Sequence, residues 1–391
     1  MIVRPHFLVA TSLFAACAAY AESPSCVFVN DAIDTGTDNL DYVRLAVRAD
    51  GRPLIVYTTD VHNASTLNLF DCDDSTCASG HIVPLDASSN YFGAPGIAIR
   101  TDGRPVVTAS WYGGLRYYDC QDTACTSFTY NQIWPNGSAI LSDMPIALQP
   151  NGNPAFIYID DTLPTAPRPG YLIVHFCADA ACSSASEQTL AMPTAADSPF
   201  STLSFAIDAN GYAAATYFES EGPSNVYTYN LARCSDTTCA SVSNVQISAP
   251  VVGSAPFRTA LALRADGLPL ALDSRSAHTA LLDCTTSDCT TFNDRALPAS
   301  ASGVPIGLSL LTNDAPAFSL FAPNSVGAFA CSDGPCTSGA EIVATNTTQS
   351  ILDADFALDA TQRPLLAYID FDTRKLSAAG CSDVIFADGF E

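Results

Sequence analysis

The sequence predicts an all-β protein, a seven-bladed β-propeller of four-stranded antiparallel blades. Three observations support this fold class. A segment of about 50 residues recurs seven times, each copy contains short strand-like runs separated by tight-turn residues, and no helical periodicity appears. Solenoids are also built from repeats, but their units are usually shorter and their ends need caps.

Each copy begins with an apolar strand that ends at a turn of the D-G or N-G type, whose residues readily adopt the positive φ of a tight hairpin. The copies begin at Leu45, Ile97, Ile146, Phe205, Leu261, Leu308 and Phe356. A second strand follows directly after the turn. Its first residues are Pro53, Pro105, Pro154, Ala213, Pro269, Pro316 and Pro364, at steps of 47 to 59 residues.

A third strand ends at a cysteine in each copy, and we expect a second cysteine to open the fourth strand. Six copies contain both cysteines, in the pairs Cys72/Cys77, Cys120/Cys125, Cys177/Cys182, Cys234/Cys239, Cys284/Cys289 and Cys331/Cys336. Facing Cα atoms on antiparallel strands lie ~4.5–5.5 Å apart, a distance that a disulfide accepts. Zinc sites usually have C-x2-C spacing and four ligands, and redox pairs are usually C-x-x-C, so we interpret these pairs as structural disulfides.

The seventh pair is divided between the two ends of the chain. Cys381 occupies the position of a first cysteine and Cys26 that of a second. The strand from about 26 to 33 is therefore predicted to complete the last blade, with 352–381, and to close the ring. A Cys26–Cys381 bond would contribute ~6 kcal/mol in the chain-entropy account, against ~2 kcal/mol for each six-residue hairpin loop.

The composition limits the classes of partner. Hydrophobic residues make up 48% of the chain, which is enough for a packed core, and 40 acidic residues against 16 basic ones give a net charge of -24. Such a surface repels nucleic acids and anionic membranes. It suits cations, neutral sugars or basic protein partners, although solubility alone also accounts for it.

The first 21 residues have the pattern of a signal peptide. Arg4 precedes an apolar run, and Ala19-Tyr20-Ala21 matches a cleavage site, so we expect residues 22–391 to form one propeller domain with a short tail at 382–391. Lipidation at Cys17 is the alternative. No other run is long enough to span a membrane. We expect an exported monomer, secreted, periplasmic or at the cell surface, in an oxidising compartment.

The last copy, "FALDATQRPLLAYID", resembles the A-L-D-x-x-G-x-P-h-h-x-Y-x-D repeat (h, apolar) of secreted bacterial propeller proteins. Asp359, Pro364, Tyr368 and Asp370 match this repeat, and Gln362 replaces its glycine. The resemblance covers residues 41 to 380, at about eight positions in each copy. It implies a propeller and export. It implies no chemistry, because these repeat families are mostly without assigned activity.

Loops that join the second strand to the third usually border the ligand face of a propeller, opposite the D-G turns and cysteine hairpins. Carboxylates beside an aromatic platform suit sugars, because carboxylate oxygens accept hydroxyl hydrogen bonds and a ring stacks on the apolar face of a sugar. The same residues are also compatible with ordinary polar loop tips. The candidate ligand residues are Asp60, Trp111, Tyr112, Asp160, Glu219, Arg275, His278 and Asp370.

We expect a non-catalytic binding module with a carbohydrate ligand, and two alternatives remain open. A glycan hydrolase or lyase would use two carboxylates, ~5–5.5 Å or ~6.5–9.5 Å apart in a hydrolase. The third possibility is a structural scaffold. We expect no cofactor, although calcium is possible where the first blade begins, because clustered carboxylates in a loop can bind it. The carboxylates concerned are Asp31, Asp34, Asp38 and Asp41.

Overall fold

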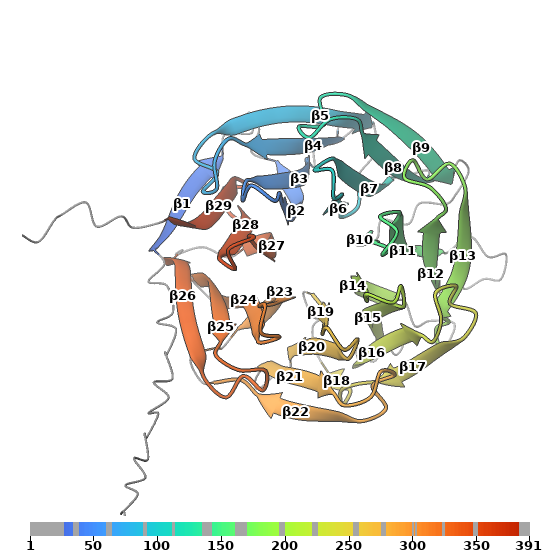
Figure 1. The fold of residues 1–391 in the computed structure, drawn as a ribbon. Coiled ribbons are helices and arrows are strands. Elements are labelled where there is room, and N and C mark those ends of the chain that lie inside the picture. The colour runs from blue at the N-terminus through green and yellow to red at the C-terminus, as the bar shows by residue number, and fades with distance from the viewer. Residues whose placement is uncertain are drawn as a thin grey trace, which may run out of the picture.

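The chain forms a ring of seven antiparallel sheets in the computed structural model (Figure 1). The structure describes residues 27–33, 39–59, 65–88, 92–111, 114–134, 143–160, 170–194, 200–220, 226–252, 258–274, 279–298, 301, 303–322, 325–346 and 351–382. The predicted seven-bladed, all-β fold is confirmed. No helix among these residues could span a membrane. The predicted signal peptide and Cys17 lie outside the described residues.

We number the blades from the one that follows the N-terminal strand. Blade 1 contains β2 (Leu40–Val47), β3 (Pro53–Thr59), β4 (Ser65–Cys72) and β5 (Gly80–Ser88). Blade 2 contains β6 (Gly96–Ile99), β7 (Pro105–Trp111), β8 (Gly114–Cys120) and β9 (Phe128–Trp134). Blade 3 contains β10 (Ile146–Leu148), β11 (Pro154–Asp160), β12 (Tyr171–Cys177) and β13 (Ala185–Ala191).

Blade 4 is the one sheet with a fifth strand among the described residues. It contains β14 (Phe200–Ile207), β15 (Ala213–Ser220), β16 (Val226–Cys234), β17 (Val242–Gln246) and the short β18 (Val251–Val252), which pairs with β16. Blade 5 contains β19 (Ala260–Leu263), β20 (Pro269–Ser274), β21 (Thr279–Cys284) and β22 (Phe292–Ala296). Blade 6 contains β23 (Val304–Leu310), β24 (Pro316–Ala322), β25 (Ser325–Cys331) and β26 (Gly339–Asn346). All seven second strands begin at the residue that the repeat predicted.

Blade 7 joins the two ends of the described chain. It contains β27 (Ile351–Leu358), β28 (Pro364–Asp370), β29 (Leu376–Ser382) and, as its outer strand, β1 (Val27–Ile33). The predicted closure of the ring by the N-terminal strand is confirmed, and Phe28 lies opposite Cys381. Cys26 lies outside the described residues, so the Cys26–Cys381 bond stays a prediction.

The hydrophobic core is divided among the junctions between blades. The described residues form seven clusters of buried side chains, and each combines residues from two neighbouring blades. Because both faces of a blade are covered, the second strands carry nearly continuous apolar runs, and every residue of β3 is buried. Tyrosines that recur at the same position of the second strand lie in these junctions, namely Tyr57, Tyr158, Tyr217 and Tyr368.

The six hairpin cysteine pairs form disulfides, as predicted, with Cα atoms 4.7–4.9 Å apart. They join the cysteine that ends each third strand to the second cysteine of the same hairpin. The bonds are Cys72–Cys77, Cys120–Cys125, Cys177–Cys182, Cys234–Cys239, Cys284–Cys289 and Cys331–Cys336. All twelve cysteines are buried.

The expectation that the second cysteine of each pair opens the fourth strand is wrong. This cysteine has a φ of 51–62° in all six hairpins, which is the left-handed region and is incompatible with an extended strand. Each fourth strand begins three residues after the second cysteine. In blade 1, for example, it begins at Gly80, and Gly80 is the residue that lies opposite Cys72. The disulfide thus closes a turn and does not join facing strand residues. The prediction is corrected in this way for Cys77, Cys125, Cys182, Cys239, Cys289 and Cys336.

Arginines at the ends of two first strands connect neighbouring blades on the face of the hairpin turns. Arg48 in blade 1 binds Asp71 at 2.6 Å and donates to the carbonyl of Thr123 in the hairpin of blade 2 at 2.7 Å. Arg100 in blade 2 binds Asp119 at 2.6 Å and donates to the carbonyl of Ala180 in blade 3. These contacts hold the cysteine hairpins against the adjacent blade.

The aspartates in the turns of the cysteine hairpins lead us to expect a loss of stability in acid. Desolvation raises the pKa of Asp74 and Asp122, but hydrogen bonds from hydroxyl and backbone N–H groups outweigh it and hold the pKa below the usual range. Similar hydrogen bonds lower the pKa of Asp179, Asp236 and Asp333. A carboxylate with a lowered pKa stabilises the fold above its unfolded pKa of about 3.9, and this contribution is lost as pH falls towards the folded pKa.

We therefore expect the melting temperature to drop below about pH 4. The combined Asp122→Asn and Asp74→Asn variant should show a smaller drop than the unchanged protein, because an amide does not titrate. Thermal melts at several pH values measure the two profiles. An unchanged pH profile in the variant would contradict an origin in the hairpin carboxylates.

Candidate functional site

The predicted ligand residues that the structure describes lie at the ends of second strands, on one face of the ring. Trp111 ends β7, Asp160 ends β11, Glu219 lies near the end of β15 and Asp370 ends β28. They belong to four different blades, and none of them lines the central pocket described below. The other four candidates lie outside the described residues: Asp60, Tyr112, Arg275 and His278.

Two of these carboxylates, Glu219 and Asp370, accept hydrogen bonds from backbone N–H groups of nearby residues. Glu219 is 4% exposed and accepts hydrogen bonds from the backbone N–H and the hydroxyl of Thr194, the latter at 2.7 Å. Asp370 is 8% exposed and accepts from the backbone N–H of Asp372 at 3.1 Å and of Thr373 at 2.7 Å. Both are therefore occupied with protein donors.

Trp111 is covered by a cation and Asp160 is half-buried. The guanidinium of Arg116 lies 4.2 Å from the centre of the Trp111 ring, and Arg116 also forms an ion pair with Asp86 of blade 1. This face of the indole is occupied by the protein, so it does not offer an open stacking platform for a sugar.

The calcium candidates are divided between described and undescribed parts of the chain. Asp31 lies in β1 opposite Ala378, and Asp41 lies in β2, whereas Asp34 and Asp38 are outside the described residues. Calcium binding there stays a prediction. One cluster of possible metal ligands occurs in the described residues, His175 with Cys177 and Cys182, but its two sulfurs are joined in a disulfide and offer no thiolate.

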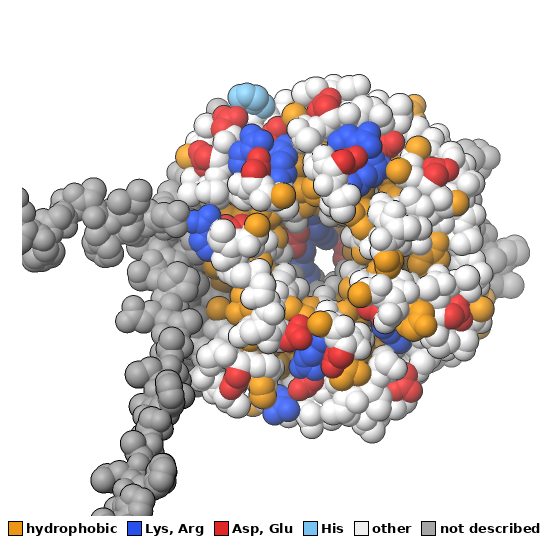
Figure 2. Space-filling view, viewed as in Figure 1, with side chains coloured by type: hydrophobic (Ala, Val, Ile, Leu, Met, Phe, Trp, Pro, Cys, Tyr) orange, Lys and Arg blue, Asp and Glu red, His pale blue; other side chains and the backbone are white. Residues whose placement is uncertain are grey.

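A cavity of about 270 Å³ lies in the central channel of the ring. Figure 2 shows the central hollow with basic and acidic side chains inside it. The residue immediately before each sequence repeat contributes to its wall. These seven residues are Arg44, Gly96, Pro145, Ser204, Ala260, Gly307 and Asp355. Small residues in four of the seven blades leave space in the channel, while Arg44 and Asp355 supply charge.

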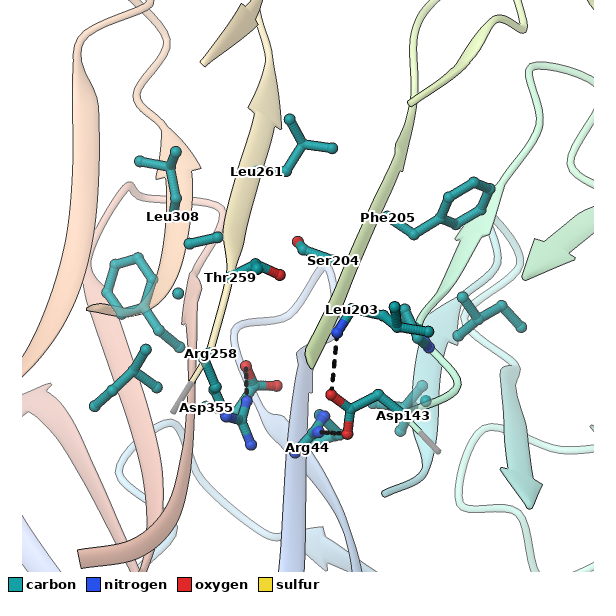
Figure 3. Close-up of a pocket in the computed structure, with 18 residues that line it drawn as sticks. Arg44, Asp143, Leu203, Ser204, Phe205, Arg258, Thr259, Leu261, Leu308 and Asp355 are labelled. Atoms are coloured by element: carbon teal, nitrogen blue, oxygen red, sulfur yellow. Dashed lines mark hydrogen bonds and ion pairs between the residues drawn. The ribbon is translucent and has the colours of Figure 1, made fainter. Parts of the chain in front are cut away.

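The pocket is polar at one end and apolar at the other (Figure 3). The polar end lies near the starts of the first strands, on the side of the ring where the second strands end. Its charged wall residues, labelled in Figure 3, are Arg44, Asp143, Arg258 and Asp355, and the opposite end holds Phe205, Leu261 and Leu308.

Five charged residues from four blades form one network at the polar end, and we call it the channel network: Arg44, Asp143, Arg258, Asp353 and Asp355. Arg44 in blade 1 binds Asp353 of blade 7 at 2.9 Å, and it binds Asp143, just before blade 3, at 3.2 Å. Arg258, just before blade 5, forms an ion pair with Asp353 and lies 3.9 Å from Asp355.

Backbone donors add hydrogen bonds to the network. Val43 N–H donates to Asp353 at 2.8 Å and Leu45 N–H donates to Asp355 at 2.7 Å. Leu203 N–H of blade 4 donates to Asp143 at 3.2 Å, a contact drawn in Figure 3. Each aspartate is thus held by at least one backbone group, and the network fixes blades 1, 3, 4, 5 and 7 relative to one another.

Burial and charge shift the pKa values of three groups at this end. Burial raises the pKa of Asp355, and Arg258 and Arg44 only partly offset it. Burial alone would lower the pKa of Arg44, but the nearby carboxylates outweigh that effect and raise it. These carboxylates are Asp353, Asp143 and Asp355. Burial, together with Asp41 and Asp143, raises the pKa of Tyr42 to about 12. Asp355 therefore retains its proton to higher pH than an exposed aspartate.

None of the channel network residues is among the residues predicted from the sequence. The prediction considered loops after the second strands, whereas the network lies on the first strands and just before them. A sequence signal exists: in the column before the repeats, Arg44 and Asp355 are the only charged residues among seven.

Comparisons with known proteins support the fold and leave the family open. No protein-family model matches the chain. No curated protein matches it either. Solved structures similar to it include a protein of unknown function from Dyadobacter fermentans, at 11% identity and a TM-score of 0.57, with 90% of this chain and 97% of that chain covered.

Two enzymes are similar to the chain at the same level. One is an ulvan lyase, a polysaccharide lyase bound to a GlcA-Rha3S glycan, at 10% identity and a TM-score of 0.58, covering 88% of this chain and 94% of that one. The other is the virginiamycin B lyase of Staphylococcus aureus with quinupristin, at 12% identity and a TM-score of 0.55, covering 91% and 100%. At such identities the likeness shows a shared propeller fold alone.

Proposed function

We propose that the protein is an exported, disulfide-stapled binding module whose ligand is a carbohydrate held in the central channel. The pocket and its channel network carry this proposal. The pocket combines carboxylate, guanidinium and hydroxyl groups with aliphatic side chains. Such a mixture suits a sugar, because a sugar needs both hydrogen-bond partners and apolar contact. Ligand pockets with this mixture, set in the middle of a rigid fold, are typical small-molecule sites.

A binding role is favoured over catalysis because the described carboxylates are held by protein groups. Asp143 and Asp353 are bound by arginines, and Glu219 and Asp370 accept hydrogen bonds from their neighbours. A glycoside hydrolase needs two carboxyl groups that reach the substrate from opposite sides of one bond. A carboxylate that is engaged by arginine and backbone donors is less available to accept or donate a proton at a substrate.

A hydrolase or lyase is the second candidate, and Asp355 favours it. Its buried carboxyl lines the pocket and its pKa is raised, which is the property that a general acid needs near neutral pH. The similar structures include a polysaccharide lyase, although the likeness concerns the fold. In this reading Asp355 would donate a proton to a glycan held in the channel.

Export is the setting that both candidates require. Six disulfides fit an oxidising compartment, and the bacterial propeller repeats that the chain resembles are secreted. The net charge of -24 favours neutral glycans or basic proteins over nucleic acids. A structural scaffold without a small ligand remains the third candidate.

A binding screen separates these roles. Residues 22–391, with disulfides intact, are tested for retention on a panel of polysaccharides, with and without calcium, and the supernatant is assayed for released sugars. We expect retention without released products. Released products would replace the binding role by the enzymatic one, and they should then disappear in Asp355→Asn. No retention and no products would leave the scaffold.

A further inference from the structure

We infer that the central pocket receives the uncharged terminal sugar of a glycan, and that it discriminates against a uronic acid at the same position. This inference rests on the proposed carbohydrate ligand and names its chemical class and its mode of entry. Two observations carry it: the balance of charge in the channel network, and the position of the network across one end of the pocket.

The channel network contains three aspartates and two arginines, so it carries no excess positive charge. Arg44 is bound by Asp143 and Asp353, and Arg258 is bound by Asp353, with Asp355 next to it. A ligand carboxylate would have to compete with these aspartates, and breaking a buried ion pair is costly. If Asp355 is protonated, the five residues are neutral, which still gives an anion no net attraction.

Hydroxyl groups of a neutral sugar meet no such competition. The Ser204 side chain lines the pocket, and within the described structure its hydroxyl has no hydrogen-bond partner. The carboxyl of Asp355 also lines the pocket and can accept or donate a hydrogen bond, depending on its protonation. At the opposite end, half-buried Leu308 offers apolar contact, whereas Phe205 and Leu261 line the wall but pack into the cores between blades.

The geometry of the network favours entry of a chain end. Arg44 connects blade 1 to Asp143 before blade 3 and to Asp353 in blade 7, and Arg258 connects to the same Asp353 from blade 5. The side chains of Arg44, Asp143 and Arg258 lie together at one end of the pocket (Figure 3), and Asp353 pairs with both arginines. A polymer that passed through the channel would have to displace them. The volume of about 270 Å³ is also just below the ~300–1,000 Å³ of typical ligand pockets.

Matched probes test the charge preference. Methyl glucoside and methyl glucuronide differ only at C6, and so do methyl galactoside and methyl galacturonide. Each of these four is titrated into the mature protein by calorimetry. Methyl xyloside and methyl arabinoside are titrated in the same way. We expect at least one neutral glycoside to bind, and its uronide, where one exists, to bind at least tenfold more weakly. For the sugar that binds, oligosaccharides of two to six units should add little affinity, because only the terminal unit enters.

Two variants and one control locate the effect. Ser204→Leu fills the pocket without removing a protein hydrogen bond in the described structure, so it should abolish binding while the protein stays folded. Asp143→Asn removes one negative charge from the pocket wall, where Asp143 pairs with Arg44, and should reduce the preference for the neutral sugar. The matched control is Asp102→Asn, which removes a charge from an exposed pair with Arg104 and should leave the preference unchanged.

The outcomes separate this inference from the proposed function. Tighter binding of a uronide, or affinity that rises steadily with chain length, would overturn the inference and leave a carbohydrate-binding role intact. Equal effects of Asp143→Asn and Asp102→Asn would also overturn it. If neither a glycoside nor any polysaccharide of the retention panel binds, the carbohydrate role fails together with the inference. Retention of a polysaccharide without binding of any glycoside would overturn the inference alone.

Discussion

Replacing Cys381 with serine lowers the stability of the mature protein more than removing any one hairpin disulfide. The predicted Cys26–Cys381 bond encloses almost the whole ring, whereas each hairpin bond closes six residues. In the chain-entropy account the closing bond contributes ~6 kcal/mol and a hairpin bond ~2 kcal/mol. The structure adds a reason for this difference, because β1 and β29 are the only strands that join the two ends of the ring in the described chain.

Urea unfolding of residues 22–391 measures the effect. The Cys381→Ser variant, alone and combined with Cys26→Ser, is compared with the double variant Cys234→Ser, Cys239→Ser, which removes a hairpin disulfide. The closing-bond variants should agree with each other and should lose about 4 kcal/mol more than the hairpin variant. Equal losses in both kinds of variant would show that the pairing of β1 with β29 closes the ring without help from a disulfide.

The fold could be predicted from the sequence because its information is local and repeated. Proline or alanine at the start of each second strand, a turn before it and a cysteine at the end of the third strand recur in every copy, and each marks a boundary that the structure reproduces. The geometry at the second cysteines, such as Cys125, Cys289 and Cys336, could not be predicted in the same way. Spacing alone does not distinguish a cysteine at the start of a strand from one with a left-handed φ inside the turn.

The pocket could not be predicted because its contacts are among the most distant in the chain. Arg44 and Asp353 are 309 residues apart and meet only when blade 7 closes on blade 1. Each lies in a strand of mostly apolar residues, and no feature of the sequence pairs one with the other. The sequence-based prediction named loop residues such as Glu219 instead, because exposed polar loops often bind ligands. In the structure Glu219 is buried and accepts hydrogen bonds from Thr194. The sequence correctly indicated a hydrogen-bonding group at this position, but it did not show that the donors bound to this group belong to the protein.

Replacing Asp353 with alanine should destabilise the protein by about 3–5 kcal/mol, because it leaves two largely buried arginines without their shared partner. Asp353 binds both Arg44 and Arg258 and also accepts the Val43 N–H. Asp50→Ala is the matched control, since it removes an exposed pair with Arg52 and should cost about 0–1 kcal/mol. Chemical denaturation of the two variants measures the difference, and a cost for Asp353→Ala within the range of the control would show that the network is not effectively buried.

A second substitution then separates stability from binding. Combining Asp353→Leu with Arg258→Met removes both members of one ion pair, and apolar replacement of a buried pair is often neutral or stabilising. We expect this double variant to recover part of the stability that Asp353→Ala loses. The recovery is partial because the Val43 N–H still lacks its acceptor and Arg44 retains its ion pair with Asp143 but loses Asp353. It should not recover the binding of a neutral glycoside. Recovery of stability without binding would mean that these charges in the channel serve recognition, since packing alone could replace their structural role.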